Sequence, residues 1–258
     1  WFLDLARELE KTNEILINDC TPDCDLILCT SVSTQGKAWE CHEKFPGIPI
    51  ANYVWDLYEW CFTRPRAWEA NYKKYGQLLK ESKFIWCSSR ATKNRVKEFY
   101  NLDSEVIYTF VPLFEYDTHD GGYIYQPLRE QPDRDWGMLE EVCQEIGIRV
   151  VTHATPYERY QEVLADCSLI VSPLYEASTG SLSLIEGAYL GKPCLVSDSS
   201  YNGGTEYLPG VPTFKAGDKG DLKRKILEGV EMTKPSLGYS VKRMACEICS
   251  YISPQVGI

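Results

Sequence analysis

The chain has 258 residues, of which 44% are hydrophobic and 25% are charged, the composition of a globular protein. Its net charge of -10 argues against a general nucleic-acid binder, because such proteins usually present a basic face. No apolar run approaches the roughly 20 residues that a membrane-spanning helix needs. The length suits one large domain or two small ones.

The first half of the chain alternates predicted helices with predicted strands. Helices are predicted at residues 1–14, 38–45, 66–82 and 90–100. Strands are predicted at residues 25–31, 46–56, 83–89 and 105–112. This alternation is typical of a parallel α/β sheet. The chain starts without Met in what resembles the middle of a helix, so we expect this first domain, residues 1–115, to be incomplete.

The alternation starts again after a polar segment, residues 113–122, that is typical of a linker. Strands are predicted at residues 122–128, 148–154, 168–174 and 192–198. Helices are predicted at residues 135–147, 156–167 and 180–191, with a further one opening at Asp218 or Asp221. We therefore predict a second sheet domain over residues 116–238, and a C-terminal helix within residues 239–258 that packs back across the domains.

The eleven cysteines are scattered along the chain, a pattern that favours free thiols in a reducing cytosol. Cys246 and Cys249 form a CxxC pair, but no histidine lies near it to complete a zinc site. We therefore interpret the cysteines as small apolar core residues and expect no metal.

The stretch with most chemical content begins where Glu176 follows a predicted buried strand, at the edge where parallel sheets place ligand groups. A helix then opens near Ser181, where free N–H groups and the helix dipole attract an anion. Glu186, within two turns of that helix, could accept hydrogen bonds from the two hydroxyls of a ribose. The glycines that follow Asn202 allow backbone amides to approach a ligand closely.

This arrangement resembles the retaining glycosyltransferases of family 4, which have the two-domain GT-B fold. The two glutamates match the pair in the second domain of that family, and residues 191–198 match its following strand. The resemblance implies an α/β protein with two Rossmann-like parallel-sheet domains that face each other across a cleft. It also implies transfer of a sugar, with retention, from a nucleotide-diphosphate donor to an acceptor hydroxyl in carbohydrate biosynthesis.

By this resemblance Glu176 contacts the transferred sugar and Glu186 holds the ribose of the donor. Arg129 and Arg134, the latter at a position where lysine is usual, would clamp the diphosphate and offset charge on the leaving group. The other predicted donor-binding residues are Thr179, Gly180, Ser181, Asn202 and Gly203. The predicted acceptor-side residues are Asp56, Tyr53 and Trp55, of which Trp55 replaces the usual histidine of the family.

The nucleotide sugar is the expected partner, as a co-substrate, and no cofactor is expected. A cytoplasmic location is expected, with no nucleic-acid partner; peripheral membrane association stays open, and the acceptor is a glycan, lipid or protein. Two other functions stay open: a sugar-nucleotide epimerase of the same fold, or a non-catalytic nucleotide-sugar-binding module. A dehydrogenase is disfavoured, because no GxGxxG motif follows a predicted strand.

Overall fold

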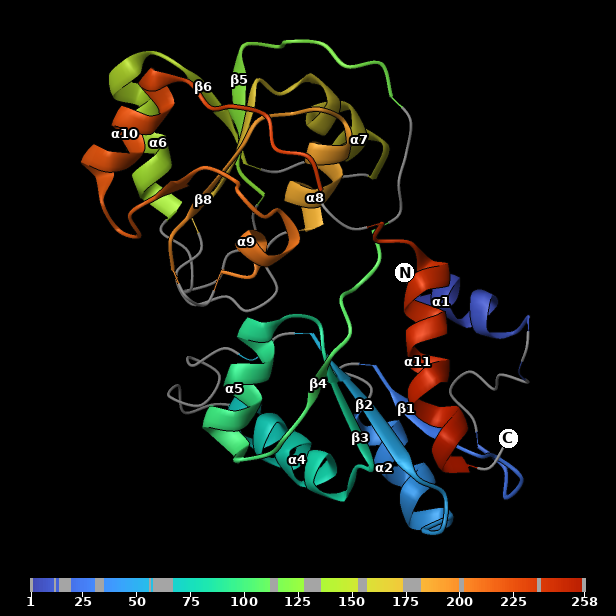
Figure 1. Cartoon of the computed structure of the whole chain (residues 1–258). Coiled ribbons are helices and arrows are strands. Elements are labelled where there is room, and N and C mark those ends of the chain that lie inside the picture. Colours follow the sequence, from blue (N-terminus) through green and yellow to red (C-terminus); the bar gives the residue numbers. More distant parts are fainter. Residues whose placement is uncertain are drawn as a thin grey trace. The chain divides into compact units, whose positions relative to one another are not determined.

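The computed structural model describes residues 2–11, 13, 20–30, 35–55, 57, 67–111, 116–127, 136–152, 157–173, 182–199, 202–235 and 238–256. The chain divides into two compact units: unit 1 is Trp1–Pro112 with Tyr239–Ile258, and unit 2 is Leu113–Gly238. Each unit is built on one parallel sheet with helices packed against it (Figure 1). The predicted α/β class with two parallel sheets is confirmed.

The sheet of unit 1, sheet A, has four parallel strands in the order β1-β2-β3-β4. The strands are β1 (Ile27–Cys29), β2 (Ile50–Val54), β3 (Phe84–Cys87) and β4 (Glu105–Val106). Every residue of β2 and β3 is buried. Strands that are buried along their whole length are typical of a parallel sheet that is covered on both faces.

Helices cover both faces of sheet A. Figure 1 shows α4 (Ala67–Glu81) and α5 (Arg90–Tyr100) on the opposite side of the sheet from α11 (Val241–Val256). α1 (Phe2–Leu9) packs against α11, and α2 (Gln35–Lys44) packs against β1. The core beneath α1 and α11 consists of Leu5, Leu9, Ala51, Tyr53, Phe84, Trp86, Ile107, Phe110, Met244, Ala245 and Ile248. The C-terminal helix therefore completes the core of unit 1.

The strand predicted over residues 105–112 is shorter in the structure, because its later backbone groups bond to other partners. The Tyr53 hydroxyl donates to the carbonyl of Ile107 at 2.7 Å. The Arg243 guanidinium on α11 donates to the carbonyl of Tyr108 at 2.6 Å, and the Val111 amide donates to the carbonyl of Tyr239 at 2.9 Å. This segment is therefore tied to the α11 region, and β4 ends at Val106.

The sheet of unit 2, sheet B, has five parallel strands in the order β6-β5-β7-β8-β9. The strands are β5 (Tyr123–Tyr125), β6 (Arg149–Val151), β7 (Leu169–Ser172), β8 (Cys194–Ser197) and β9 (Thr213–Phe214). The chain places β6 on one side of β5 and then returns to place β7 on the other. The strand order therefore reverses between β5 and β7, which is the topological switch point of an open α/β sheet.

Side chains alternate between the two faces of sheet B. Tyr123, Tyr125, Ile170 and Val196 share one core with residues of α7 (Tyr157–Asp166) and α8 (Leu182–Tyr189). Ile124, Val171 and Leu195 share the other core with residues of α6 (Trp136–Ile146) and α10 (Lys219–Glu228). These helices occupy the predicted ranges, and Asp218 caps α10 by accepting from the Asp221 amide at 3.0 Å. The short helix α9 (Gly204–Tyr207) was not predicted.

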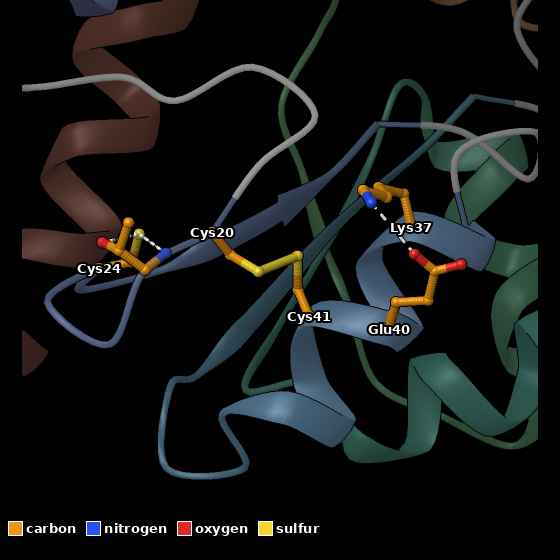
Figure 2. The surroundings of a disulfide bond; sticks show 6 residues. Cys20, Cys24, Lys37, Glu40 and Cys41 are labelled. Carbon is orange, nitrogen blue, oxygen red and sulfur yellow. Dashed lines mark hydrogen bonds and ion pairs between the residues drawn. A yellow bond between two sulfur atoms is a disulfide. The ribbon is translucent and has the colours of Figure 1, made fainter.

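Cys20 and Cys41 form a disulfide that links the segment before β1 to α2 (Figure 2). The expectation of free thiols is therefore wrong for these two residues. Cys87, Cys143, Cys167 and Cys194 are buried cysteines outside this disulfide. No local pattern marks this pair, because its members become neighbours only when α2 packs against β1.

The disulfide should stabilise unit 1 by restricting the unfolded chain. Cys20 and Cys41 are 21 residues apart, a loop for which a crosslink is worth about 3 kcal/mol. We expect Cys20→Ser to lower the free energy of unfolding by about that amount in a non-reducing denaturant titration. Cys246→Ser, at an exposed free cysteine, is the matched control and should leave it unchanged. Equal stability of both variants and the parent would contradict the assignment.

Candidate nucleotide-sugar site

The candidate site lies at the carboxyl edge of sheet B, where β5 and β7 flank the switch point. Gln126 directly follows β5, and Pro173 directly follows β7. Ligand sites of open α/β sheets form outside the carboxyl ends of strands at such a point. Of the predicted site residues, the structure describes Glu186, Asn202 and Gly203 in unit 2, and Tyr53 and Trp55 in unit 1.

Glu186 is a buried carboxylate on α8, with 6% of its surface exposed. Its Oε2 atom accepts a hydrogen bond from the Tyr160 hydroxyl, which comes from α7. The same hydroxyl lies 3.0 Å from Oγ of Ser183, one turn earlier on α8. Burial raises the pKa of Glu186 from 4.5 to about 7, although the Tyr160 hydrogen bond acts in the opposite direction. The carboxylate is therefore poised between its charged and neutral forms near neutral pH.

The sequence of α8 explains why this carboxylate is buried. Leu184, Ile185, Gly187 and Ala188 surround Glu186 in the helix and are all buried. A Cβ atom at Gly187 would collide with the Ile170 side chain of β7, so glycine permits the close approach of α8 to the sheet. A charged residue at such a position is costly unless it has a partner, which marks Glu186 as a candidate for function.

Asn202 organises the turn before α9. Its Oδ1 atom accepts from the Gly204 amide at 3.0 Å, and its Nδ2 atom donates to Oγ of Ser197 at 3.1 Å. Its own amide donates to the carbonyl of Ser199 at 2.9 Å. Gly203 precedes α9 with a φ of -64°, which any residue can adopt. Asn202 thus shapes this turn through contacts within unit 2, and the donor contact predicted for both residues stays a prediction.

Tyr53 and Trp55 lie at the carboxyl end of β2 in unit 1. Tyr53 is 1% exposed, and its ring packs edge-on to that of Trp55, with centroids 5.9 Å apart. Because its hydroxyl is bonded to the carbonyl of Ile107, Tyr53 is a core residue. The Trp55 carbonyl accepts from the Ser88 hydroxyl at 2.7 Å, which joins the ends of β2 and β3. Trp55 is half-buried and directly follows β2, and its acceptor-side role stays a prediction.

The remaining predicted site residues lie outside the described residues. They are Asp56, Arg129, Arg134, Glu176, Thr179, Gly180 and Ser181. Their roles stay predictions. Within the ranges that the structure describes, no group of three or more His, Cys, Asp or Glu side chains is gathered for a metal ion. In the same ranges, no helix is both long enough and apolar enough to cross a membrane.

Sequence reasoning missed two residues at this edge of sheet B. Gln126 is fully buried, and neither atom of its side-chain amide has a hydrogen-bond partner in the described part of the chain. Its position directly after a strand is a signal that could have identified it. Tyr160 precedes Glu186 by 26 residues on another helix, so only the packing of α7 against α8 brings the two together.

Solved structures with a similar fold cover most of the chain. TarM of S. aureus matches 98% of it at 14% identity, with a TM-score of 0.62. HepE of Anabaena, solved with UDP, matches 98% at 12% identity, with a TM-score of 0.59. Sucrose-phosphate synthase from Thermosynechococcus elongatus matches 90% at 13% identity, with a TM-score of 0.58. The matched regions make up 55%, 80% and 72% of these three proteins, respectively.

These matches establish the class of fold. It is the GT-B fold, which the resemblance to family 4 implied. The chain spans little more than half the length of TarM. No family model matches the chain, and no curated protein sequence matches it.

The raised pKa of Glu186 should make stability depend on pH. Between pH 4.5 and about 7 the unfolded chain loses the Glu186 proton while the folded chain keeps it, so stability falls as pH rises. Glu186→Gln removes this term. We expect the difference in unfolding free energy, variant minus parent, to rise by about 3 kcal/mol between pH 4 and pH 8.

Denaturant titrations at several pH values would measure this difference. Glu140→Gln, at an exposed position on α6, is the matched control and should show a constant difference from the parent. A constant difference for Glu186→Gln as well would show that the Glu186 carboxyl titrates alike in the folded and unfolded chains.

Proposed function

We propose that unit 2 binds a nucleotide-diphosphate sugar and that the protein transfers the sugar to an acceptor hydroxyl with retention. The observation that carries this proposal is the buried Glu186 carboxylate in the domain of sheet B, whose strand order reverses between β5 and β7. HepE, which has a similar fold, has been solved with UDP and with UDP-glucose. A UDP-sugar is therefore the first donor to test.

In this proposal Glu186 recognises the ribose. A charged carboxylate has two acceptor oxygens and can accept hydrogen bonds from both vicinal hydroxyls of a ribose. Oε2 already accepts from Tyr160, and a carboxylate oxygen has capacity for a second bond. Oε1 accepts no hydrogen bond from the described residues. The carboxylate can thus bind a ribose without giving up its contact with α7.

The transfer itself exchanges one C–O bond for another. The bond between the anomeric carbon and the donor phosphate oxygen breaks, and the acceptor oxygen bonds to that carbon. The acceptor proton passes to the leaving phosphate, so no side-chain nucleophile is needed. Arg129 and Arg134 would offset the charge that develops on the diphosphate, and Glu176 would contact the sugar.

The first test is binding. A thermal-shift screen of UDP, GDP and ADP, each alone and as its glucose ester, should show stabilisation by a uracil compound, because a ligand of the folded state stabilises by mass action. At 100 times its dissociation constant the ligand adds about 2.7 kcal/mol. Glu186→Gln should weaken UDP binding about 10-fold or more, since a hydrogen bond to a charged group is worth about 1.5–3 kcal/mol.

Glu140→Gln should bind UDP like the parent. If no nucleotide or nucleotide sugar shifts the melting temperature of the parent, the proposed function is wrong.

The second test separates transfer from binding alone. Glu176→Gln should retain UDP binding but lose transfer and donor hydrolysis by about 100-fold or more, as expected for a group that acts on the transferred sugar. If Glu176→Gln and Glu186→Gln both turn over donor like the parent, the catalytic assignment fails. If the parent binds donor without hydrolysis or transfer to any acceptor, the binding-module alternative, which Trp55 at the usual histidine position keeps open, is favoured instead.

A further inference from the structure

We infer that Tyr160 is a positioning residue for donor binding: its hydroxyl donates to Oε2 of Glu186, favours the charged form of the carboxylate and orients it for the ribose. This inference rests on the proposed function, because it assigns a role within the same site. It adds a residue from a second helix, α7, to a site that the sequence placed on α8 and its preceding turn.

The geometry holds Tyr160 from two sides. Its hydroxyl contacts both Glu186 and Ser183, which lie three residues apart and therefore on the same face of α8. Its ring packs against the ring of Tyr125 on β5, with centroids 6.3 Å apart and planes inclined by 64°. The sheet thus fixes the ring while the helix receives the hydroxyl, and the Glu186 side chain has a defined partner.

The hydrogen-bond chemistry favours one direction. A phenol has one proton to donate, and a carboxylate is the stronger acceptor of the two groups it contacts, so the proton points to Glu186. Ser183 can in turn donate to the Tyr160 oxygen. The hydrogen bond from Tyr160 to Glu186 favours the charged carboxylate and opposes the effect of burial. Without it, Glu186 would hold its proton at a higher pH and would lose acceptor capacity for a ribose.

The other titratable groups of this core do not supply a charge near pH 7. Burial raises the pKa of the Cys167 thiol to about 12 and also raises that of Cys194. The pKa of Tyr160 is raised by burial and by Glu186, and Tyr125 is buried beside it. Burial likewise raises the pKa of Tyr123 on β5 to about 12, so these thiols and phenols with raised pKa values are neutral near pH 7. Tyr160 is therefore the described group that most directly influences the charge of Glu186.

Tyr160→Phe removes the hydroxyl and keeps the ring, so it tests the inference directly. UDP affinity, measured by titration calorimetry from pH 6 to pH 9, should fall about 10-fold near pH 7. The loss should shrink as pH rises, because alkali then charges Glu186 in the variant as well. Protonation of UDP itself affects both proteins alike. Tyr116→Phe, at an exposed tyrosine of unit 2, is the control and should reproduce the parent profile.

Each other outcome has a distinct meaning. An affinity and pH profile equal to those of the parent would overturn the positioning role, as would a loss of the same size at every pH. A parent that binds no nucleotide would instead overturn the proposed function.

A second variant covers the case in which Tyr160→Phe does not fold. Ser183→Ala removes the other hydroxyl partner and leaves the Tyr160 donor for Glu186 alone. Ser183 helps to orient the Tyr160 hydroxyl, so its loss should weaken UDP binding near pH 7 by a few-fold, as expected for a neutral hydrogen bond. The loss should again shrink as pH rises; unchanged affinity, or a loss of the same size at every pH, would show that this hydroxyl pair does not act through the charge of Glu186, and the inference would fail.

Discussion

The buried carboxylate of Glu186 is the constraint around which the second unit of this protein is arranged. The neighbours of Glu186 in α8 are apolar and buried, so this one charged group lies where burial opposes its charge. The hydroxyl of Tyr160 offsets part of that cost, and the packing of α7 against α8 holds it there. A group kept between its charged and neutral forms in this way is unfavourable for stability and is typical of a binding or catalytic site.

The sequence predicted the α/β fold well because its signals are local. Apolar runs such as that of β7 and the caps of helices such as α10 depend on neighbouring residues, and the alternation of strands with helices implies parallel sheets. Sequence analysis missed the structural features that depend on residues far apart in the chain. β4 ends early because the backbone groups that follow it form hydrogen bonds with Arg243 and Tyr239, which lie far along the chain. The Cys20–Cys41 bond likewise requires β1 and α2 to pack together.

The candidate site was predicted in the same uneven way. Glu186 was predicted from its place within two turns of a helix that follows a strand and a small-residue turn, and from the resemblance to family 4. Its partner Tyr160 had no such signal, since nothing in residues 157–166 distinguishes a tyrosine that meets α8 from one that packs elsewhere. Asn202 was predicted from its glycine neighbours, whereas its side chain serves the turn into α9. Local pattern thus identified the carboxylate, and only packing identified what holds it.

The central claim is that the charged form of Glu186 receives the ribose of a donor nucleotide. The most direct test of this claim is the number of protons released when UDP binds. Calorimetry near pH 7, in buffers of different ionisation enthalpy, measures that number. With a Glu186 pKa of about 7, roughly half of the free protein holds this proton, so binding should release about 0.5 proton per UDP more than in Glu186→Gln. Equal proton release in both proteins would contradict the claim.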